Sequence, residues 1–496
     1  MHYHLRPGGV TTVIREQLRA LSRQCDCLVL SGELPPTGAP TGAPTGAPTG
    51  APAGAPTGAP AGEEPDLAAA VRVVPGLGYD EPGRGSPDPH ATAAVVIAAM
   101  IDEWGSVADV LHVHNALLNK NSSLLSILEI LQEGGIALFI QVHDLAEDGR
   151  PSTYNRRGEY PRDCHYGVVN SRDQRALLAS GLVPEGLHLL FNVVRPLGGG
   201  SIAGLPSQER GGSRLRLLYP VRAIRRKNIG EALLLGMLLD ADVSMTLPPQ
   251  NPSDRLLYDG WKSFARSRGL PAEFDVGLAR GLEQLMGEST ATVTTSVKEG
   301  FGFSFLEPWT AGRAAAGRRI DAVCGDFEKE GVRLPHLYSS LAVPVALFDA
   351  PAFRGRWEAS LAAAFKSFGR SVDGVTVERA YSEMTKGGLI DFASLDEDAQ
   401  REVIDRAAPH GVARREIEAI NPALDALRSG LAAPDRSLAE GNRSVIHSRF
   451  GSARYGEVLA GIYRAVVDEP VRHGIDRGAL LDRFLSPGRF RMLEQR

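Results

Sequence analysis

The segment from Thr295 to Glu307 carries the pattern with the most chemical content in this chain. It reads Thr-Ser-Val-Lys-Glu-Gly-Phe-Gly-Phe-Ser-Phe-Leu-Glu, so an apolar run is followed by a glycine turn and a helix expected near Ser304. A strand, a glycine turn and a helix start aim free N–H groups and a positive dipole at one point, which suits a phosphate. Glu307 could accept two hydrogen bonds from a ribose diol, and Glu299 one from a sugar hydroxyl. Glu307 could instead only complement the helix dipole.

A cationic segment follows the apolar run Leu215–Tyr219. From Arg222 to Lys227 it reads Arg-Ala-Ile-Arg-Arg-Lys. Ligands of open α/β sheets bind at the carboxyl ends of strands, which is where this segment is expected. Arg222 offers a planar fork for phosphate oxygens and Lys227 a point charge. A solvated charged face is the alternative interpretation.

Two weaker signals lie in the first half. Gly8 and Gly9 follow Arg6 and lead into the first helix, where they form a simple turn or let backbone approach a ligand. Polar residues end two further apolar runs: His112, His114 and Asn115, then His143 and Asp144. They could hydrogen-bond a ligand, hold a metal or be structural. No spacing here is specific for a metal, and no second cysteine pair joins Cys25 and Cys27 to complete a zinc site.

Short apolar runs alternate with helical stretches, which predicts a doubly wound α/β fold. A helix capped by Thr11 or Thr12 and another over Ser122–Gln132 show helical spacing of apolar residues. The strand candidates in the first half are Cys25–Leu30, Val71–Val74, Val110–Val113, Ala137–Val142 and Gly167–Val169, and those in the second half are Leu215–Tyr219, Val243–Leu247, Glu273–Val276 and Thr292–Thr295.

The two alternating series predict two Rossmann-like domains facing across a cleft, with a helical C-terminal extension. We expect domains at residues 1–194 and 214–350, joined by a Gly-rich linker at 195–213. Residues 351–496 are expected to be mostly helical, with a closing helix near 452–467. The Thr-Gly-Ala-Pro repeat at 35–62 is expected to be an inserted surface loop. Only Met1–Leu5 precede the first glycine turn, so either the first strand is very short or the true start lies upstream.

Composition excludes several classes of function. The chain has 496 residues and a net charge of −5, which argues against a dedicated nucleic-acid binder because phosphate neutralisation needs basic excess. The longest apolar run, Ala91–Ile101, is far short of the roughly 20 residues a membrane span needs. No basic-then-apolar signal sequence opens the chain. We therefore expect a cytoplasmic protein without a membrane span; its oligomeric state is not readable.

Together and in this order, the four signals resemble the retaining glycosyltransferases of the two-Rossmann-domain (GT-B) type, specifically glycosyltransferase family 4. The family's Glu-x7-Glu motif matches Glu299 through Glu307, and its Arg and Lys in the second domain's first loop match Arg222 and Lys227. Its N-terminal Gly-Gly turn and mid-domain histidine match further residues: Gly8, Gly9 and His143. The segments Tyr219–Asn228 and Phe484–Leu493 are also similar to synthases of glycosylated glycerates.

The resemblance implies a role for each matched residue. The catalytic set would be Arg222, Lys227, Glu299 and His143, with Arg222 and Lys227 on the donor diphosphate and His143 near the donor sugar. Glu307 would bind the ribose. The other donor-binding residues would be Gly300, Phe301, Gly302 and Phe303, whose N–H groups hold the sugar, with Gly8 and Gly9 at the diphosphate. His4, Arg6, His112 and Asn115 would line the acceptor site.

The implied activity is transfer of a sugar from a nucleotide-diphosphate sugar to a small polar acceptor, such as a glycerate. Cationic side chains can stabilise the leaving nucleotide, so no metal or other cofactor is required. A nucleotide-sugar isomerase or epimerase on the same fold, and a degenerate member that only binds the nucleotide sugar, remain as alternatives. A glycosidase fits less well, because its carboxylates lie about 5–9.5 Å apart whereas eight helical residues span about 12 Å.

The sequence departs from the family in three places. The opening strand is short, the repeat is inserted, and the segment after Gly312 reads Arg-Ala-Ala-Ala-Gly-Arg-Arg where the family continues with an apolar strand. The first and last departures put stability and the geometry of the donor loop in question, and they motivate the non-catalytic alternative.

Overall fold

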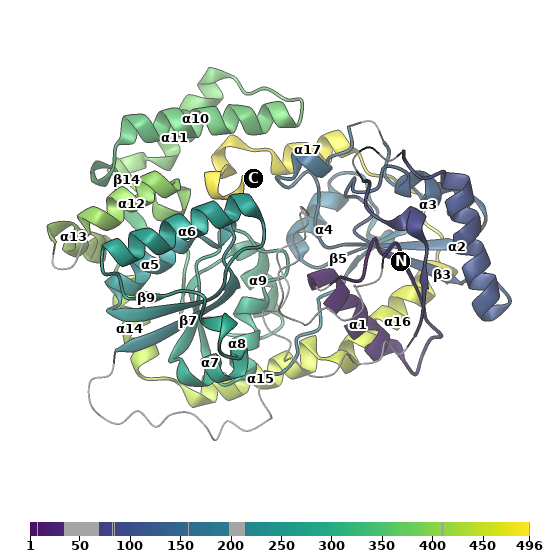
Figure 1. Cartoon of the computed structure of the whole chain (residues 1–496), viewed down its shortest axis with the longest axis horizontal. Helices are drawn as coiled ribbons and strands as arrows, with labels where there is room; N and C mark the ends of the chain where they lie inside the picture. Colours follow the sequence, from purple (N-terminus) through teal and green to yellow (C-terminus); the bar gives the residue numbers. More distant parts are fainter. Residues whose placement is uncertain are drawn as a thin grey trace.

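The computed structural model of the chain describes residues 1–6, 8–33, 69–81, 83, 85–156, 158–197, 214–407 and 411–495. The predicted repeat insertion at 35–62 lies outside these residues, as does the linker beyond Leu197. The described part forms two α/β halves side by side, with further helices over one of them and across the base (Figure 1). No helix in these ranges is long and apolar enough to cross a bilayer.

The first half contains two groups of parallel strands, and the N-terminal segment lies between them. One sheet runs β3-β4-β5-β6 and a second pairs β1 with β2. Residues 1–5 lie between them, because His2 N donates to Leu30 O (3.1 Å) and His114 N donates to Met1 O (3.1 Å). The predicted first strand is therefore reduced to a single bridge between His2 and Ser31. The elements are β1 Leu28–Ser31, β2 Ala70–Val73, β3 Val110–His114, β4 Ala137–Val142, β5 His165–Val168 and β6 Leu187–Leu189, with α1 Gly9–Leu21, α2 Pro89–Trp104, α3 Leu124–Glu133 and α4 Ser171–Leu178.

Helix α1 begins earlier than the sequence predicted. Gly8 is its N-cap residue and Gly9 its first residue, whereas Thr11 or Thr12 was the expected cap. The Thr11 hydroxyl donates to Arg6 O (2.7 Å) and the Thr12 hydroxyl to Gly8 O (3.2 Å). Both hydroxyls are thus donors to carbonyls of the preceding turn instead of acceptors for helix N–H groups. The glycine turn itself is the helix start.

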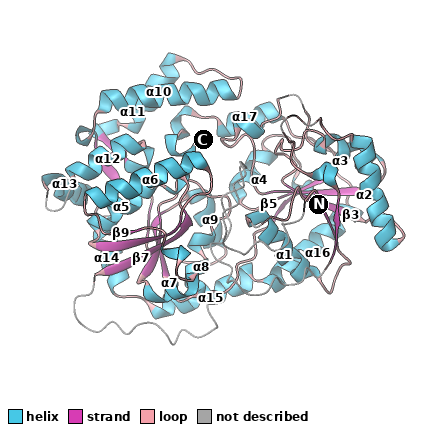
Figure 2. Ribbon diagram, in the orientation of Figure 1, coloured by secondary structure: helices cyan, strands magenta, loops and turns pink. Residues whose placement is uncertain are grey.

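The strands of the second half form one parallel sheet, drawn in magenta around β7 and β9 (Figure 2). Its six strands lie in the order β12-β11-β10-β7-β8-β9. Its strands reverse direction of winding between β7 and β10, which is the topological switch point of a doubly wound sheet and the place where such sheets bind ligands. Its elements are β7 Leu215–Arg222, β8 Ala241–Leu247, β9 Ala272–Glu273, β10 Ala291–Thr294, β11 Ala314–Arg318 and β12 Leu337–Tyr338, with α5 Ile229–Leu238, α6 Pro252–Ser267, α7 Leu282–Glu288, α8 Glu307–Thr310 and α9 Asp321–Lys329.

Strand β11 corrects the expectation that the segment after Gly312 departs from a regular strand. Ala314–Arg318 pairs in parallel with both β10 and β12. The strand is packed on both faces, so it has room only for small side chains. At Gly317 even a Cβ atom would lie 2.2 Å from Thr294 O. Arg318 is fully buried and its guanidinium binds both Glu231 and Asp391. The segment reads as polar in the sequence because its last residue, Arg318, belongs to a buried ion cluster.

Beyond β12 the chain is mainly helical, as predicted, with one two-stranded antiparallel pair of β13 Ala342–Pro344 and β14 Leu389–Asp391. Helix α16 runs back from the second half and packs on α1 and β4 (Figure 1). It matches the closing helix expected near 452–467. The helices are α10 Ala350–Ser367, α11 Gly374–Met384, α12 Glu397–Arg406, α13 Val412–Ile420, α14 Ala423–Ala432, α15 Arg436–Phe450, α16 Ser452–Asp468 and α17 Arg477–Phe484.

Candidate functional site

The switch point of the second sheet brings together a buried lysine and a buried glutamate. Lys227 ends a 3₁₀ turn after β7, and Glu299 lies in the loop after β10. Lys227 Nζ donates to Glu299 Oε1, and their side chains are 9% and 5% exposed. Burial lowers the pKa of Lys227. Burial alone would raise the pKa of Glu299, but the charges of Lys227 and Arg226 hold it below its ordinary value. Each side chain of the pair therefore supplies the hydrogen-bond partner and the counter-charge of the other.

Arg222 is the last residue of β7 and has a different environment from Lys227. Its Nη1 donates to Pro248 O (3.2 Å), and no carboxylate in the described ranges pairs with it. Burial without a counter-charge lowers the pKa of Arg222. A guanidinium held in this way gains most from an anionic ligand, because the ligand supplies the missing charge.

Glu307 is also buried without a partner. It is the first residue of α8, which starts three residues later than predicted because a 3₁₀ turn, Phe303–Phe305, comes first. Its carboxylate accepts no hydrogen bond from any described residue, and burial raises its pKa to about 7. The unmet acceptor oxygens suit a ligand with two adjacent hydroxyl donors.

The loop between Glu299 and α8 is fixed by its glycines and aromatic rings. Gly302 has φ +93°, and a Cβ there would lie 2.7 Å from Val323. The rings of Phe301 and Phe303 pack in a core cluster with Phe327 and Phe450. Within the described part, the N–H groups of Gly300, Phe301 and Gly302 donate to no protein acceptor. These free backbone N–H groups are therefore the donors that the loop can offer to a ligand.

His143 approaches this loop from the first half. A Cβ on Gly300 would lie 3.5 Å from His143 O, and Asn170 Nδ2 donates to Gly300 O (2.9 Å). Asn115, with φ +55°, orients the histidine, because its Oδ1 accepts the N–H groups of His143 (2.8 Å) and Asp144 (3.1 Å). Burial lowers the pKa of His143 to about 4, so the ring is neutral.

The other predicted first-half residues spread over the edge of the first sheet. His112 contacts the closing helix, with Nδ1 2.8 Å from Tyr463 Oη. His4 Nε2 lies 3.1 Å from Tyr79 Oη, and Arg6 pairs with Glu33. The described residues contain no group of three or more potential metal ligands.

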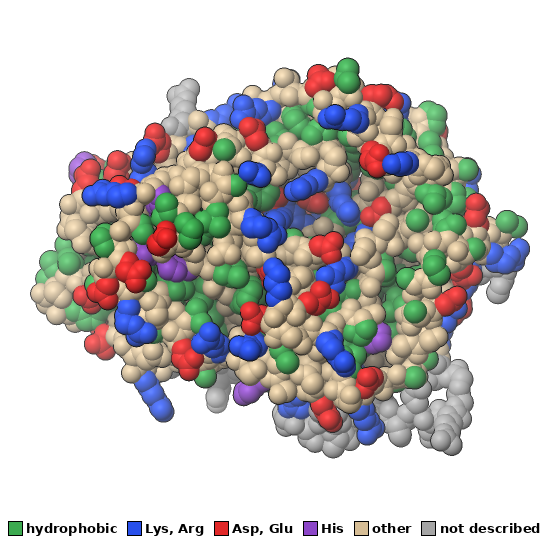
Figure 3. All heavy atoms as spheres, turned by 180° about the vertical axis from the view of Figure 1, so that it is seen from behind, with side chains coloured by type: hydrophobic (Ala, Val, Ile, Leu, Met, Phe, Trp, Pro, Cys, Tyr) green, Lys and Arg blue, Asp and Glu red, His purple; other side chains and the backbone are tan. Residues whose placement is uncertain are grey.

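The contacts that join the two halves beside this site were not anticipated from sequence. Lys298, next to Glu299, donates to Asp148 O (2.7 Å) and pairs with Asp148 Oδ1 (2.6 Å) and Glu494 Oε2 (3.5 Å). Arg226 donates to Lys298 O (2.9 Å) and acts electrostatically on Asp144. Lys and Arg side chains gather around the hollowed middle of the molecule seen from behind (Figure 3). Only the position of Lys298 beside the Glu-x7-Glu motif could have drawn attention to it.

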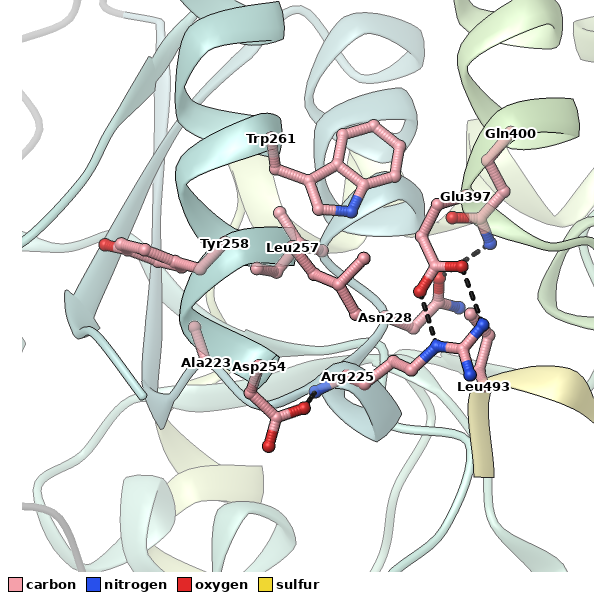
Figure 4. Close-up of a pocket in the computed structure, with 11 residues that line it drawn as sticks. Ala223, Arg225, Asn228, Asp254, Leu257, Tyr258, Trp261, Glu397, Gln400 and Leu493 are labelled. Atoms are coloured by element: carbon pink, nitrogen blue, oxygen red, sulfur yellow. Dashed lines mark hydrogen bonds and ion pairs between the residues drawn. The ribbon is translucent and has the colours of Figure 1, made fainter. Parts of the chain in front are cut away.

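A small pocket lies behind the cationic loop (Figure 4). Arg225 crosses it and forms two bonds to Glu397 (2.6 and 2.8 Å), while its backbone N–H donates to Asp254 (3.1 Å). Leu493 of the C-terminal segment closes one side, and Arg225 Nη1 donates to Gln495 O (3.2 Å). The Arg225–Glu397 ion pair at this pocket ties the loop that holds Lys227 to α12.

Comparison with known proteins supports the same architecture. No family model matches the chain. A mannosylglucosyl-3-phosphoglycerate synthase from Petrotoga mobilis is 24% identical over 234 residues, which is 42% of this chain and 46% of that protein, so the match spans less than half of the relative's length. The structure of a sucrose-phosphate synthase from Thermosynechococcus elongatus superposes with a TM-score of 0.50 and 13% identity, covering 93% of this chain and 94% of that one. A glycosyltransferase from Rickettsia africae gives 0.49 and 11%, covering 94% and 98%. The chain has the GT-B fold.

Proposed function

We propose that the protein is a retaining glycosyltransferase that moves a sugar from a nucleotide-diphosphate sugar to a hydroxyl of a small polar acceptor. The observation that carries the proposal is the buried Lys227–Glu299 pair at the switch point, with His143 O facing the next residue, Gly300. Arg222 ends β7 and Glu307 starts α8, at the carboxyl side of the same sheet. The Petrotoga relative is named as a synthase of a glycosylated phosphoglycerate, which supports the acceptor class.

The donor would replace the ion pair between Lys227 and Glu299, and would supply an anionic partner to Arg222 and hydrogen-bond donors to Glu307. Lys227 and Arg222 would meet the diphosphate, and Glu299, released from Lys227, would accept a sugar hydroxyl. Glu307 would accept the ribose diol, and the free N–H groups of Gly300–Gly302 would hold the sugar. Gly8 and Gly9 would lie against the diphosphate at the start of α1, where the helix N–H groups favour an anion.

In the reaction, the bond from the sugar's anomeric carbon to the phosphate oxygen breaks and a bond to the acceptor oxygen forms on the same face. The nucleotide diphosphate leaves with the bonding electrons, and the two cations stabilise that charge. The acceptor's proton must be taken up. His143, with a pKa of about 4, is a poor base at neutral pH, so the released phosphate oxygen is the better acceptor. His143 O would instead position the sugar through the Gly300 loop.

The alternative of a degenerate protein that only binds the nucleotide sugar was partly based on the irregular segment after Gly312. That segment is a regular strand, which removes this argument. An isomerase would convert the nucleotide sugar with no acceptor present, and product analysis distinguishes it.

The test has two stages. A thermal-shift panel of UDP-, GDP- and ADP-sugars identifies the donor, and release of the nucleotide diphosphate is then followed with D-glycerate, 3-phosphoglycerate and glycerol as acceptors. Lys227→Ala and Glu299→Ala should each lower transfer by at least about 10³-fold while circular dichroism stays unchanged. Lys366→Ala, at an exposed position of α10, is the matched control. Full activity of both site variants would overturn the proposal.

A further inference from the structure

The first half of the molecule holds the donor loop, residues 298–303, on both sides of Glu299. Lys298 precedes Glu299 and reaches Asp148, with its Nζ 2.6 Å from Asp148 Oδ1. Gly300 follows Glu299, and its carbonyl oxygen accepts a hydrogen bond from Asn170 Nδ2 (2.9 Å). Asp148 lies in the loop after β4 and Asn170 shortly after β5, so both come from the carboxyl edge of the first sheet. Glu299 thus lies between two residues that are bound to the opposite half.

Asn170 is held in one orientation by its own helix. It is the N-cap residue of α4, where its Oδ1 accepts the Asp173 N–H (2.8 Å) and its Nδ2 donates to Asp173 Oδ2 (2.9 Å). The residue is buried, with 2% of its surface exposed. The second proton on Nδ2 remains for the Gly300 oxygen. A fixed helix start therefore places a hydrogen-bond donor against the donor loop.

The bond from Asn170 determines where the next amide of the loop points. In a trans peptide the C=O and N–H groups lie in one plane and point in opposite directions. Because Asn170 holds the Gly300 oxygen, the Phe301 N–H points away from the Asn170 side chain. This N–H donates to no acceptor among the described residues. Asn170 thereby orients one of the free donors that we expect to hold the donor sugar.

Asp148 binds Lys298 within a buried cluster of charges. Asp148 Oδ2 pairs with Arg172 (2.7 Å), and Lys298 Nζ also donates to the Asp148 carbonyl (2.7 Å). Burial alone would raise the pKa of Asp148, but the two cations hold it well below its ordinary value. The carbonyl of Lys298 accepts from Arg226 Nη1 (2.9 Å), which ties the same residue to the cationic loop of the second half. The peptide that leads into Glu299 is thus fixed from both halves.

We propose that Asn170 and Asp148 are positioning residues for sugar transfer, which set the loop around Glu299 in the geometry that holds the donor sugar. Because both belong to the first half, this geometry exists only while the two halves are docked. The nucleotide contacts proposed for Arg222 and Glu307 come from β7 and α8 and involve neither residue. Nucleotide binding should therefore depend on the second half alone, and transfer on both. This inference rests on the proposed glycosyltransferase function.

Another contact between the halves allows docking and positioning to be told apart. Ser171, next to Asn170, donates from its N–H (2.7 Å) and its hydroxyl (2.5 Å) to Asp326 of α9. In the part of the chain that the structure describes, Asp326 forms no hydrogen bond with the donor loop. A change at Asp326 therefore weakens the docking of the halves and leaves the loop's own bonds in place.

Two variants of the full chain test the inference directly. Asn170→Ser keeps a good N-cap residue but is too short to reach the Gly300 oxygen, and Asp148→Asn removes the charge that holds Lys298. Each should lower kcat by at least about tenfold, since a displacement of about 1 Å can cost about 100-fold in rate. Turnover is followed with whichever of UDP-, GDP- and ADP-glucose gives the largest thermal shift. Calorimetry with the corresponding nucleoside diphosphate should show unchanged affinity.

Matched variants separate positioning from general damage. Asp326→Asn should lower kcat by less than about threefold, and Asp405→Asn, which breaks a half-exposed pair within the second half, should behave as wild type. Lys298→Met should lower kcat as much as Asp148→Asn does, and the double variant no further, because both changes remove the same contact. Circular dichroism shows whether each variant is folded.

Unchanged kcat in both Asn170→Ser and Asp148→Asn would overturn the inference and leave the proposed function standing. A loss in Asp326→Asn as large as that in Asn170→Ser would overturn it too, because docking of the halves, and not the position of the loop, would then limit the reaction. If the wild-type protein neither binds nor consumes any nucleotide sugar, the proposed function fails, and this inference fails with it.

Discussion

Polar side chains are buried at the carboxyl edges of both sheets, but in different states: neutral histidines at the first and an ion pair at the second. At the first sheet, His112, His114 and His143 lie in a row, with His143 Nε2 3.0 Å from His114 Nδ1, and burial lowers the pKa of all three. At the second sheet, the buried Lys227 and Glu299 side chains form an ion pair, so each compensates the other's charge. Neutral imidazoles need no ligand to be stable, whereas Arg222 and Glu307 remain unpaired and gain from one. The second edge is therefore the one suited to a charged donor.

Breaking the charged pair from one side should have the largest effect. Lys227→Met leaves Glu299 as a buried carboxylate, so we expect a loss of about 3 kcal/mol in the free energy of unfolding along with loss of transfer. The double variant Lys227→Met/Glu299→Gln should recover most of the stability but no activity. Thermal unfolding and nucleotide release measure the two effects.

An exposed ion pair provides the control for that cycle. Arg255 and Asp259 lie one turn apart on α6 and are about half exposed. Arg255→Ala should cost only about 0.3–0.5 kcal/mol. A Lys227/Glu299 double variant as unstable as the single variants would contradict the interpretation that an uncompensated charge, and not lost packing, causes the damage.

Glu307 should show the cost of a buried charge with no partner. Its folded pKa of about 7 lies above its ordinary value of 4.5, so the folded state holds a proton that the unfolded chain releases. Stability should fall as pH rises from about 4.5 to 7 and stay level above it. Glu307→Gln should therefore be more stable than wild type by about 3 kcal/mol at pH 8 and by almost nothing at pH 4.

Nucleotide-sugar affinity gives the functional counterpart. It should tighten as pH rises through 7, where Glu307 becomes a carboxylate able to accept the ribose diol. Titration calorimetry at pH 6 and pH 8 would show this, and the dependence should disappear in Glu307→Gln. A wild-type protein whose affinity does not change between these pH values would argue that Glu307 only faces the helix dipole.

Among the site residues, His143 should give the smallest effect on stability, with a pH dependence of opposite sign to that of Glu307. A folded pKa of about 4 for His143, below the ordinary 6.5, means that the unfolded chain binds the extra proton. Stability from this residue is full above about pH 6.5 and is lost as pH falls toward 4. At pH 5.5 the loss is about 1 kcal/mol. The difference in stability between His143→Asn and wild type should shrink by this amount between pH 7.5 and 5.5; a constant difference would mean that His143 is not buried as a neutral ring.

The sequence predicted much of the fold because parallel strands buried on both faces appear as continuous apolar runs. Ala137–Val142 is predicted to the residue as β4. Strand β11 was missed because its alanines and Arg318 look like a loop until Glu231 and Asp391 supply the partners. Strand β6 was missed because three residues are too few to show a period.

The charged candidates of the site were visible in the sequence because each follows a predicted strand. Their partners were not. Lys298, the neighbour of Glu299, and Asp148 lie 150 residues apart, on loops of different halves. No spacing rule relates such residues; only the winding of the sheets brings their loops to one edge. The roles of the predicted site residues remain predictions.

The chain passes between the halves at three places, and their positions set how far the halves can separate. The first two passages meet, since Val194 N donates to Phe450 O (2.9 Å). The third is the short C-terminal stretch from Phe484, packed on the first core, to Phe490, packed on the second. Six residues of extended chain reach at most about 20 Å. The two halves can therefore rotate about the Val194–Phe450 contact only as far as the stretch from Phe484 to Phe490 allows. A larger separation would require Phe490 to leave the second core.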